Sequence, residues 1–188
     1  MNKPENLFPE VLEFEPKIHR DERGFFFEAW KQSSYRQLGL QDELVQLNIS
    51  RSRQAVLRGL HYQQPNPQGK LVAVLEGKII DIVVDIRMGS PNFSRWQSYQ
   101  LDSQSGRQIY VPEGFAHGFQ VLSETALVAY MCSREYDPQG DSSIAWDDPD
   151  LDINWPLQPS VMTAKDVKAK RLAEIPADRL PVFDGPLA

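Results

Sequence analysis

Short segments rich in aliphatic, β-branched and aromatic residues recur along the chain, and Gly, Pro, Asn or Ser separate most of them. Segments of this kind, spaced by about ten residues, are typical of a β-sandwich or a β-barrel. The pattern predicts strands over residues 24–30, 43–49, 56–63, 70–75, 79–86, 108–111, 117–122 and 127–132. We therefore expect an all-β fold that forms a single domain over residues 1–188.

Residues 71–75 and 79–86 flank Gly77 and predict a β-hairpin in which this glycine forms the turn. In the second arm, alternation places four aliphatic side chains on one face and Asp81 and Asp85 on the other. We interpret the acidic face as the more solvated side of the sheet. The alternative is that the two aspartates line a site.

Helix signals occur in two places. Ser33 or Ser34 can cap a short helix through residues 35–38, which Gly39 then ends. Residues 163–174 are predicted to form a helix with Thr163 as its cap. The tail beyond it, with prolines at 176, 181 and 186, is expected to run extended over the surface.

Composition narrows the class of protein. With 41% hydrophobic and 24% charged residues among 188, the chain resembles a soluble globular protein. The sequence has no run of 18 apolar residues, which argues against a membrane span, and its net charge of −6 argues against a nucleic-acid partner. Cys132 is the only cysteine, so an internal disulfide and a cysteine-based zinc site are excluded. A lone cysteine and the absence of an apolar leader predict a cytoplasmic protein.

Charge is unevenly distributed. Residues 44–75 contain no acid but hold Arg51, Arg53, Arg58 and Lys70, which is compatible with an anion site or with arginines that solvate a sheet face. Residues 135–152 show the reverse and contain seven acids without a base. Because this stretch lacks the spacing of a calcium loop, we interpret it as a solvated loop.

Two histidines lie in strand segments rich in glycine and aromatic residues. Arg58 and His61 are three residues apart, so alternation would aim them at opposite faces unless Gly59 marks a bulge. His117 follows a Pro-x-Gly turn and stands between small residues, where a ligand could approach. Strand histidines are more often structural than catalytic, and residue type alone does not decide between the two roles.

Several blocks, in order and spacing, match a known family. They comprise residues 21–28, 46–50, 57–63, 68–72, 84–87, 90–91, 112–119, 146–149, 155–156 and 165–166, together with Tyr130 and Ile153. On these blocks the chain resembles the dTDP-4-dehydrorhamnose 3,5-epimerase family over nearly its whole length. The resemblance implies a cupin-type β-jelly roll with short flanking helices that works as a homodimer without metal or cofactor. Metal-binding cupins carry a His-x-His pattern, whereas the matching place here reads His61-Tyr62-Gln63.

The resemblance also implies a reaction. Such an enzyme inverts carbons 3 and 5 of dTDP-4-keto-6-deoxyglucose through an enolate, giving dTDP-4-keto-L-rhamnose for dTDP-L-rhamnose biosynthesis. The alternatives are an epimerase that inverts carbon 3 alone, a sugar ketoisomerase on the same fold, and a non-catalytic sugar-binding cupin.

The family pattern assigns a role to each matching residue. His61 matches the base, Asp166 the carboxylate that orients it, Lys70 the cation beside the ketone oxygen, and Tyr130 the acid on the opposite face. Residues that match substrate contacts are Arg23, Glu28, Gln46, Asn48, Arg58, His117, Asp141 and Lys165.

Two details qualify this pattern. In the family, Glu28 reaches a thymidine bound to the partner subunit. Asp141 stands where the family usually has Glu, which leaves its role in question. Tyr136 either stacks near the nucleotide or packs in the core.

Overall fold

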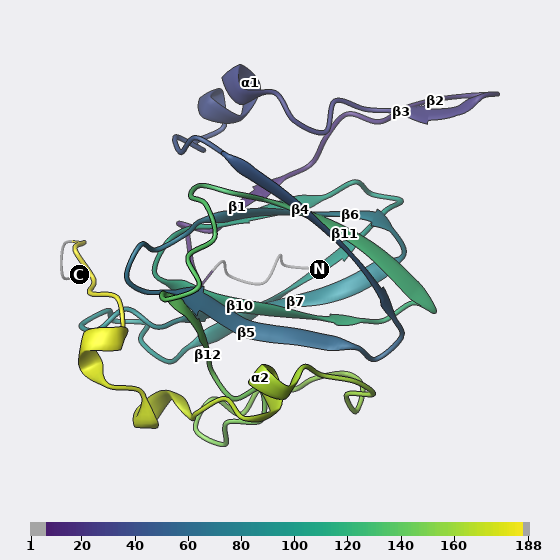
Figure 1. The fold of residues 1–188 in the computed structure, drawn as a ribbon. Helices are drawn as coiled ribbons and strands as arrows, with labels where there is room; N and C mark the ends of the chain where they lie inside the picture. The colour runs from purple at the N-terminus through teal and green to yellow at the C-terminus, as the bar shows by residue number, and fades with distance from the viewer. Residues whose placement is uncertain (1–6, 186–188) are drawn as a thin grey trace.

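Two five-stranded antiparallel sheets form the body of the protein in a computed structural model that describes residues 7–185 (Figure 1). The first sheet has the strand order β1 (Leu12–Phe14), β9 (Gln108–Val111), β6 (Lys70–Glu76), β11 (Thr125–Cys132) and β4 (Gln46–Arg53). The second has the order β12 (Asp141–Ser143), β5 (Leu57–Gln63), β10 (Phe115–Val121), β7 (Lys78–Asp85) and β8 (Trp96–Asp102). A separate hairpin joins β2 (His19–Asp21) to β3 (Gly24–Phe26). The predicted all-β fold is confirmed.

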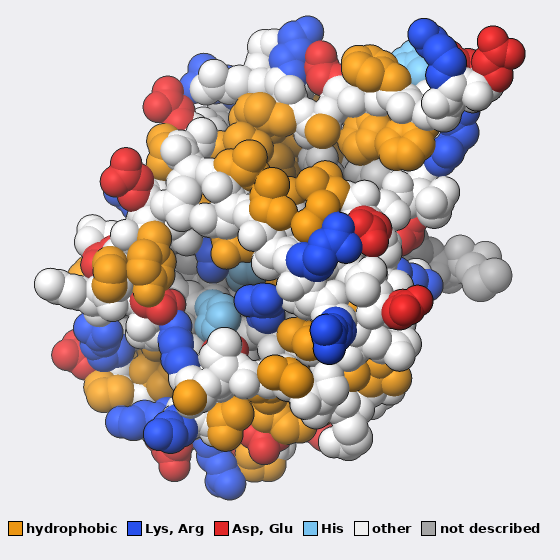
Figure 2. Space-filling model, turned by 45° about the vertical axis from the view of Figure 1, so that its right-hand side comes forward, with side chains coloured by type: hydrophobic (Ala, Val, Ile, Leu, Met, Phe, Trp, Pro, Cys, Tyr) orange, Lys and Arg blue, Asp and Glu red, His pale blue; other side chains and the backbone are white. Residues whose placement is uncertain are grey.

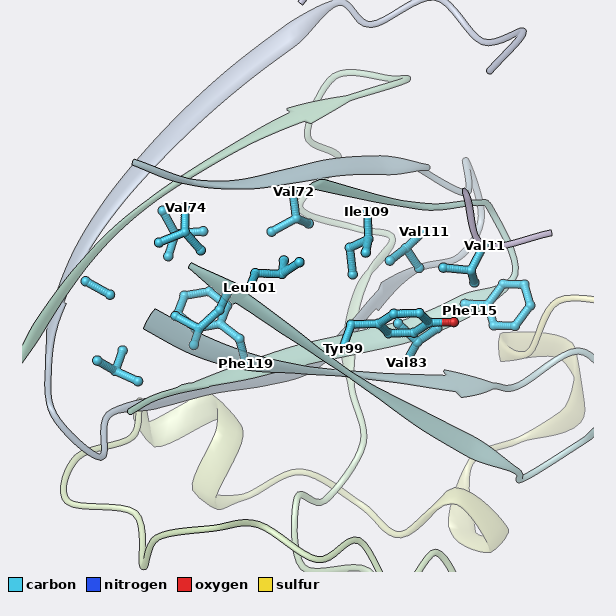
Figure 3. Close-up of a cluster of buried hydrophobic side chains, with 14 of the residues drawn as sticks. Val11, Val72, Val74, Val83, Tyr99, Leu101, Ile109, Val111, Phe115 and Phe119 are labelled. Carbon is cyan, nitrogen blue, oxygen red and sulfur yellow. The ribbon is translucent and has the colours of Figure 1, made fainter. Parts of the chain in front are cut away.

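The two sheets face each other and enclose a hydrophobic core (Figure 3). Val72, Val74 and Ile109 come from the first sheet, and Val83 and Phe119 come from the second. All five are nearly inaccessible to solvent. This core fills one part of the interior, so the remaining part can hold polar side chains and a ligand.

The predicted hairpin around Gly77 is wrong. β6 pairs with β9 and β11, whereas β7 pairs with β8 and β10 in the other sheet. Gly77 therefore forms a corner between the sheets, with a φ of +82°. A Cβ there would overlap the carbonyl oxygen of Thr125, so the corner requires glycine.

Asp81 and Asp85 do not face solvent as expected; both are fully buried. The inner face of β7 carries Ile79 and Val83 into the core, and its outer face carries Ile82 and Val84 against the C-terminal segment. Because that segment covers the second sheet, both faces of β7 are shielded from solvent. Alternation in a strand shows which side chains share a face but not what covers it.

The first helix begins earlier than predicted. α1 (Gln32–Gln37) has Lys31 at its N-cap and no side-chain cap, so neither Ser33 nor Ser34 plays that role. The buried side chain of Tyr35 holds it in place, and its hydroxyl donates to Gln108 Oε1 at 2.7 Å. Gly39 follows its end with a φ of +107°, as expected.

The second helix is much shorter than predicted. Thr163 is the N-cap, and its Oγ1 accepts from Asp166 N, but α2 (Ala164–Val167) ends where residues 163–174 were expected to continue as a helix. The chain extends instead, because the Ala145 amide donates to the Lys170 carbonyl at 2.9 Å and Leu172 packs against the outer face of the second sheet. Two short 3₁₀ turns follow at Leu172–Glu174 and Ala177–Arg179. The tail then bridges Val182 to Met88, while Pro186 lies outside the described residues.

Several strand boundaries differ from the prediction. β4 runs over 46–53 rather than 43–49, only 24–26 of the segment 24–30 form a strand, and β1, β2, β8 and β12 were not predicted. β8 has the sequence WQSYQLD, in which only Tyr99 and Leu101 are buried, so its apolar pattern is weak. No helix in the described part of the chain is long and apolar enough to cross a membrane.

Apolar side chains remain exposed in one region. The β2–β3 hairpin projects from the body (Figure 1), and Phe25 and Phe26 on it are 55% and 71% exposed. Leu47 and Ile49 point outward from β4 and are also exposed. Figure 2 shows hydrophobic side chains gathered between the hairpin and a central hollow.

Candidate active site

A hollow between the sheets holds most of the residues expected to act on substrate. Its outer part measures about 280 Å³, and its inner part, about 100 Å³, reaches towards the core. His61, Lys70 and Tyr130 line both parts. In Figure 2, histidine and basic side chains gather in this hollow.

The sequence left open whether Gly59 marks a bulge, and the structure has a bulge there. On β10, His117 pairs with His61 while Phe119 pairs with Arg58, so β5 has one more residue than its partner between these points. The extra residue brings Arg58 and His61 to the same side, and both line the inner part. Gly59 has a φ of +125°, and a Cβ there would overlap the backbone of Gly118.

The imidazole of His61 is held by a buried carboxylate. His61 Nε2 lies 2.6 Å from Asp166 Oδ1, and the Asp166 side chain has no exposed surface. Burial alone would raise the pKa of Asp166, but hydrogen bonds from His61, Thr163 and Gly59 outweigh it and the pKa is lowered. An ionised Asp166 accepts Nε2–H and leaves the lone pair on Nδ1 of His61. His61 can therefore act as a base.

Lys70 and Tyr130 enter the hollow from the first sheet. Lys70 lies on β6 beside Cys132, and Tyr130 lies two residues before Cys132 on β11. Desolvation lowers the pKa of Lys70, while Cys132, Asp141 and Asp81 oppose that effect. Desolvation raises the pKa of Tyr130, with Cys132 adding to the rise and Arg58 opposing it. Tyr130 therefore keeps its proton at neutral pH and can donate it.

A row of inward polar residues on β4 forms one wall. Gln46 Nε2 donates to Asn48 Oδ1 at 3.0 Å, and Arg58 Nε donates to Ser52 Oγ at 3.0 Å. Between these pairs, the buried hydroxyl of Ser50 has no partner among the described residues. The row offers hydrogen-bonding groups to a polar ligand.

His117 lies deeper, on β10. Its Nδ1 is 3.4 Å from Asp81 Oδ1, and both side chains are buried. Desolvation, together with Lys70, lowers the pKa of His117, while Asp81 opposes that effect. His117 is neutral at neutral pH.

Asp141, Lys165 and Tyr136 form the rim. Lys165 Nζ lies 2.5 Å from Asp141 Oδ2, and the Tyr136 hydroxyl donates to the same oxygen at 3.0 Å. Tyr136 is 55% exposed, so it is not a core residue. Asp141, which stands where the family usually has Glu, thus contacts both of the other rim residues.

Arg23 and Glu28 lie away from this hollow. Arg23 is on the projecting hairpin, with its side chain 86% exposed and paired with Asp21 at 2.6 Å. Glu28 lines a separate groove beside α1. Within a single chain, these two residues do not join the other predicted site residues.

Only two of the four basic residues in the acid-free segment 44–75 line the site. Arg58 and Lys70 line the hollow, whereas Arg51 pairs with Glu76 on the surface and Arg53 faces outward. In the acidic stretch, Asp148 is buried and accepts from the Leu172 amide at 2.7 Å, so that segment is not uniformly solvated. Residues 7–185 contain no group of three His, Cys, Asp or Glu that could hold a metal ion.

Two residues at the site were missed or misplaced by the sequence analysis. Ser50 follows Gln46 and Asn48 at the spacing of one strand face, so strict alternation along β4 could have found it. Asp81 was noticed but assigned to solvent, and nothing in the local sequence shows that the C-terminal segment buries its strand.

The model of the dTDP-4-dehydrorhamnose 3,5-epimerase family matches residues 5–174. The chain belongs to this family. The epimerase of Methanothermobacter thermautotrophicus is 44% identical over 165 residues, covering 86% of this chain and 89% of that protein.

Solved structures of epimerases share the fold. The Legionella pneumophila dTDP-6-deoxy-D-glucose-3,5-epimerase in complex with dTDP-4-keto-L-rhamnose has a TM-score of 0.92 and 48% identity, over 95% of this chain and 96% of that one. ChmJ, a 3′-monoepimerase from Streptomyces bikiniensis solved with dTDP-quinovose, has a TM-score of 0.84 and 34% identity, over 92% and 89% of the two chains. The expected jelly roll of the epimerase family is confirmed.

Proposed function

We propose that the hollow between the sheets epimerises carbons 3 and 5 of dTDP-4-keto-6-deoxyglucose, with His61 as base and Tyr130 as acid. One observation carries this assignment: His61 on β5 and Tyr130 on β11 enter the same hollow from opposite sheets. A flat enolate held between them can lose a proton from one face and regain one on the other. Removal and return from opposite faces is inversion.

The chemistry requires more than a base. A ketone α-proton has a pKa near ~20 against ~6.5 for histidine, a gap of roughly 18 kcal/mol. A positioned acid or base contributes about 10²- to 10⁴-fold, so the site must also stabilise the oxygen of the enolate. Lys70 lines both parts of the hollow together with His61 and Tyr130 and supplies that charge.

The proton steps follow from this arrangement. Nδ1 of His61 takes the proton next to the ketone, and the electron pair of the C–H bond moves to the oxygen beside Lys70. Asp166 stabilises the imidazolium. Tyr130 then gives its proton to the same carbon on the opposite face, and the enolate collapses to the ketone. Protons must be exchanged with solvent before the second carbon reacts, because His61 is now charged and Tyr130 ionised.

The diphosphate binds beside Arg58, and the nucleotide binds at the rim of the hollow. Arg58 holds one side of the inner hollow and offers its guanidinium to an anion. Gln46, Asn48, Lys165 and Asp141 are on the wall or rim of the outer part, which has the larger volume.

We propose a homodimer that completes each site. Arg23 and Glu28 stand away from their own hollow, and the hairpin that carries Arg23 exposes Phe25 and Phe26. Outward-facing Leu47 and Ile49 on β4 add apolar surface that a second copy would cover. We further place the enzyme in the cytoplasm, where the single buried Cys132 stays reduced.

Proton NMR of the nucleotide sugar incubated with the protein in D₂O tests the reaction. Deuterium at both carbons, with formation of the L-rhamno product, supports double epimerisation. Deuterium and inversion at carbon 3 alone would show that the protein is a monoepimerase. No exchange at either carbon would indicate a sugar-binding protein without this activity. His61→Asn is the control for exchange that the ketone undergoes unaided.

Complementation tests the shared site. Arg23→Ala and His61→Asn are each expected to be inactive, and co-expression should form mixed dimers with one intact site. Random mixing then restores about a quarter of wild-type activity, because half the dimers are mixed and each has one good site. No restoration, with mixed dimers shown by two affinity tags, would place Arg23 in its own subunit's site.

A further inference from the structure

Asp81 is a carboxylate buried inside the core where a hydrophobic residue would be expected. Its neighbours on the inner face of β7, Ile79 and Val83, belong to the hydrophobic cluster, and Val83 is drawn in Figure 3. The Asp81 side chain has no exposed surface, and neither of its oxygens has a hydrogen-bond partner that meets normal geometry among the described residues. Burying a charge in this way is costly unless opposite charges compensate it.

The groups that face Asp81 come from three strands. His117 on β10 lies 3.4 Å away, Lys70 on β6 interacts with it electrostatically, and Tyr99 on β8 is its register partner. Tyr99 is a neutral phenol, because burial and the nearby acids raise its pKa. Around Lys70 stand three further titratable groups, Cys132, Asp141 and Lys165. Burial raises the pKa of the Asp81 carboxyl group, while His117 and Lys70 oppose that rise. Asp81 is thus a fully buried acidic residue behind the reactive hollow.

Asp85 lies on the same face of β7 as Asp81 and has a structural role. Its carboxylate accepts from Arg87 at 2.6 and 2.9 Å and from Ser90 Oγ at 2.6 Å. Asp85 is therefore satisfied by its own neighbours and takes no part in the hollow. Asp81 has only His117 and Lys70, and both of these line the hollow.

We propose that Asp81 is a positioning residue for this reaction: it accepts Nδ1–H of His117, which turns Nε2 of that ring towards the hollow, and its charge keeps Lys70 protonated beside the enolate oxygen. Desolvation favours the neutral amine of a buried lysine. A buried anion offsets that effect without touching the substrate. The proposal rests on the role assigned to Lys70 in the proposed function.

The test compares Asp81→Asn with the matched control Asp85→Asn. Asparagine keeps the shape of the side chain and removes its charge. For Asp81→Asn we expect kcat at neutral pH to fall about tenfold or more, while KM and the affinity for dTDP change less than about threefold. The alkaline limb of the kcat profile should move to lower pH by about one unit, a tenfold change in the Lys70 protonation equilibrium.

Asp85→Asn should lower the melting temperature and leave kcat and the alkaline limb of the folded enzyme unchanged. A merely structural role for Asp81 predicts that the two variants behave alike. An unchanged kcat and an unmoved limb in Asp81→Asn would overturn the proposal. The proposed function would then still stand if wild-type enzyme exchanges both protons in D₂O, so the two failures are distinguishable.

A measurement on the wild-type protein reports directly on the His117 ring. The chain has three histidines, and ¹⁵N NMR distinguishes protonated from bare ring nitrogens. We expect a neutral His117 with its proton on Nδ1, assigned by comparison with His117→Asn. A proton on Nε2 instead would overturn the proposal.

Discussion

His61 Nε2 and Asp166 Oδ1 lie 2.6 Å apart although the residues are separated by 105 positions in the chain. The contact depends on α2, since Thr163 Oγ1 accepts from the Asp166 amide and fixes where that helix starts. A single capping residue near the C-terminus thereby sets the orientation of the base on β5.

The first prediction concerns this pair. Asp166→Asn should reduce kcat on the order of 10²- to 10⁴-fold, because the imidazolium of His61 loses its counter-charge and its fixed tautomer. The buried hydrogen bond should also contribute about 1–3 kcal/mol to stability.

The pH dependence of that stability follows from the lowered pKa of Asp166. A carboxyl group with a depressed pKa in the folded state stabilises the protein above its unfolded pKa of about 3.9, and this contribution is lost as pH falls through the folded pKa. The melting temperatures of wild type and Asp166→Asn should therefore differ most near neutral pH and converge below about pH 4. A constant difference across that range would contradict the assignment.

The second prediction separates the base from the acid. His61→Asn should lose both epimerisation and solvent exchange, because no enolate forms without the base. Tyr130→Phe should lose inversion but retain some deuterium exchange, since His61 can remove a proton and return one to the same face. NMR in D₂O measures both. Equal loss of exchange and inversion in Tyr130→Phe would show that the phenol also holds the ketone oxygen.

The third prediction concerns the phosphate contact. Arg58→Ala should weaken dTDP binding by about 1.5–3 kcal/mol, roughly 10- to 150-fold, because a charge-assisted hydrogen bond is lost. Calorimetry measures this affinity. Arg53→Ala is the control, since Arg53 faces outward from β4, the preceding strand in the chain, and it should bind dTDP like the wild type. Undiminished affinity in Arg58→Ala would show that the diphosphate binds elsewhere in the hollow.

The fourth prediction concerns metal ions. The metal-binding pattern of cupins is interrupted at His61-Tyr62-Gln63, and the described residues form no alternative cluster. Exhaustive dialysis against a chelator should therefore leave turnover and melting temperature unchanged. Loss of turnover that a divalent metal restores would count against the mechanism.

Local sequence determined much of this protein. Alternation and turn residues identified most strands of both sheets, and Thr163 correctly predicted the start of α2. Gly59 was raised from the sequence as a possible bulge, and the structure shows that only glycine fits its backbone conformation and the close approach to Gly118. The residues of the hollow were named from the family resemblance, and their catalytic roles stay predictions.

Tertiary structure decided the rest. β6 and β7 read as a hairpin, but each found its partners in a different sheet, because strand pairing depends on contacts distant in the chain. The helix expected over 163–174 stopped at Val167, since burying Leu172 and pairing Lys170 with Ala145 outweighed helix propensity. Asp81 is an acidic residue, and its place in an isolated strand predicts that it faces solvent. It is buried only because the other sheet lies over one face of β7 and the C-terminal segment over the other.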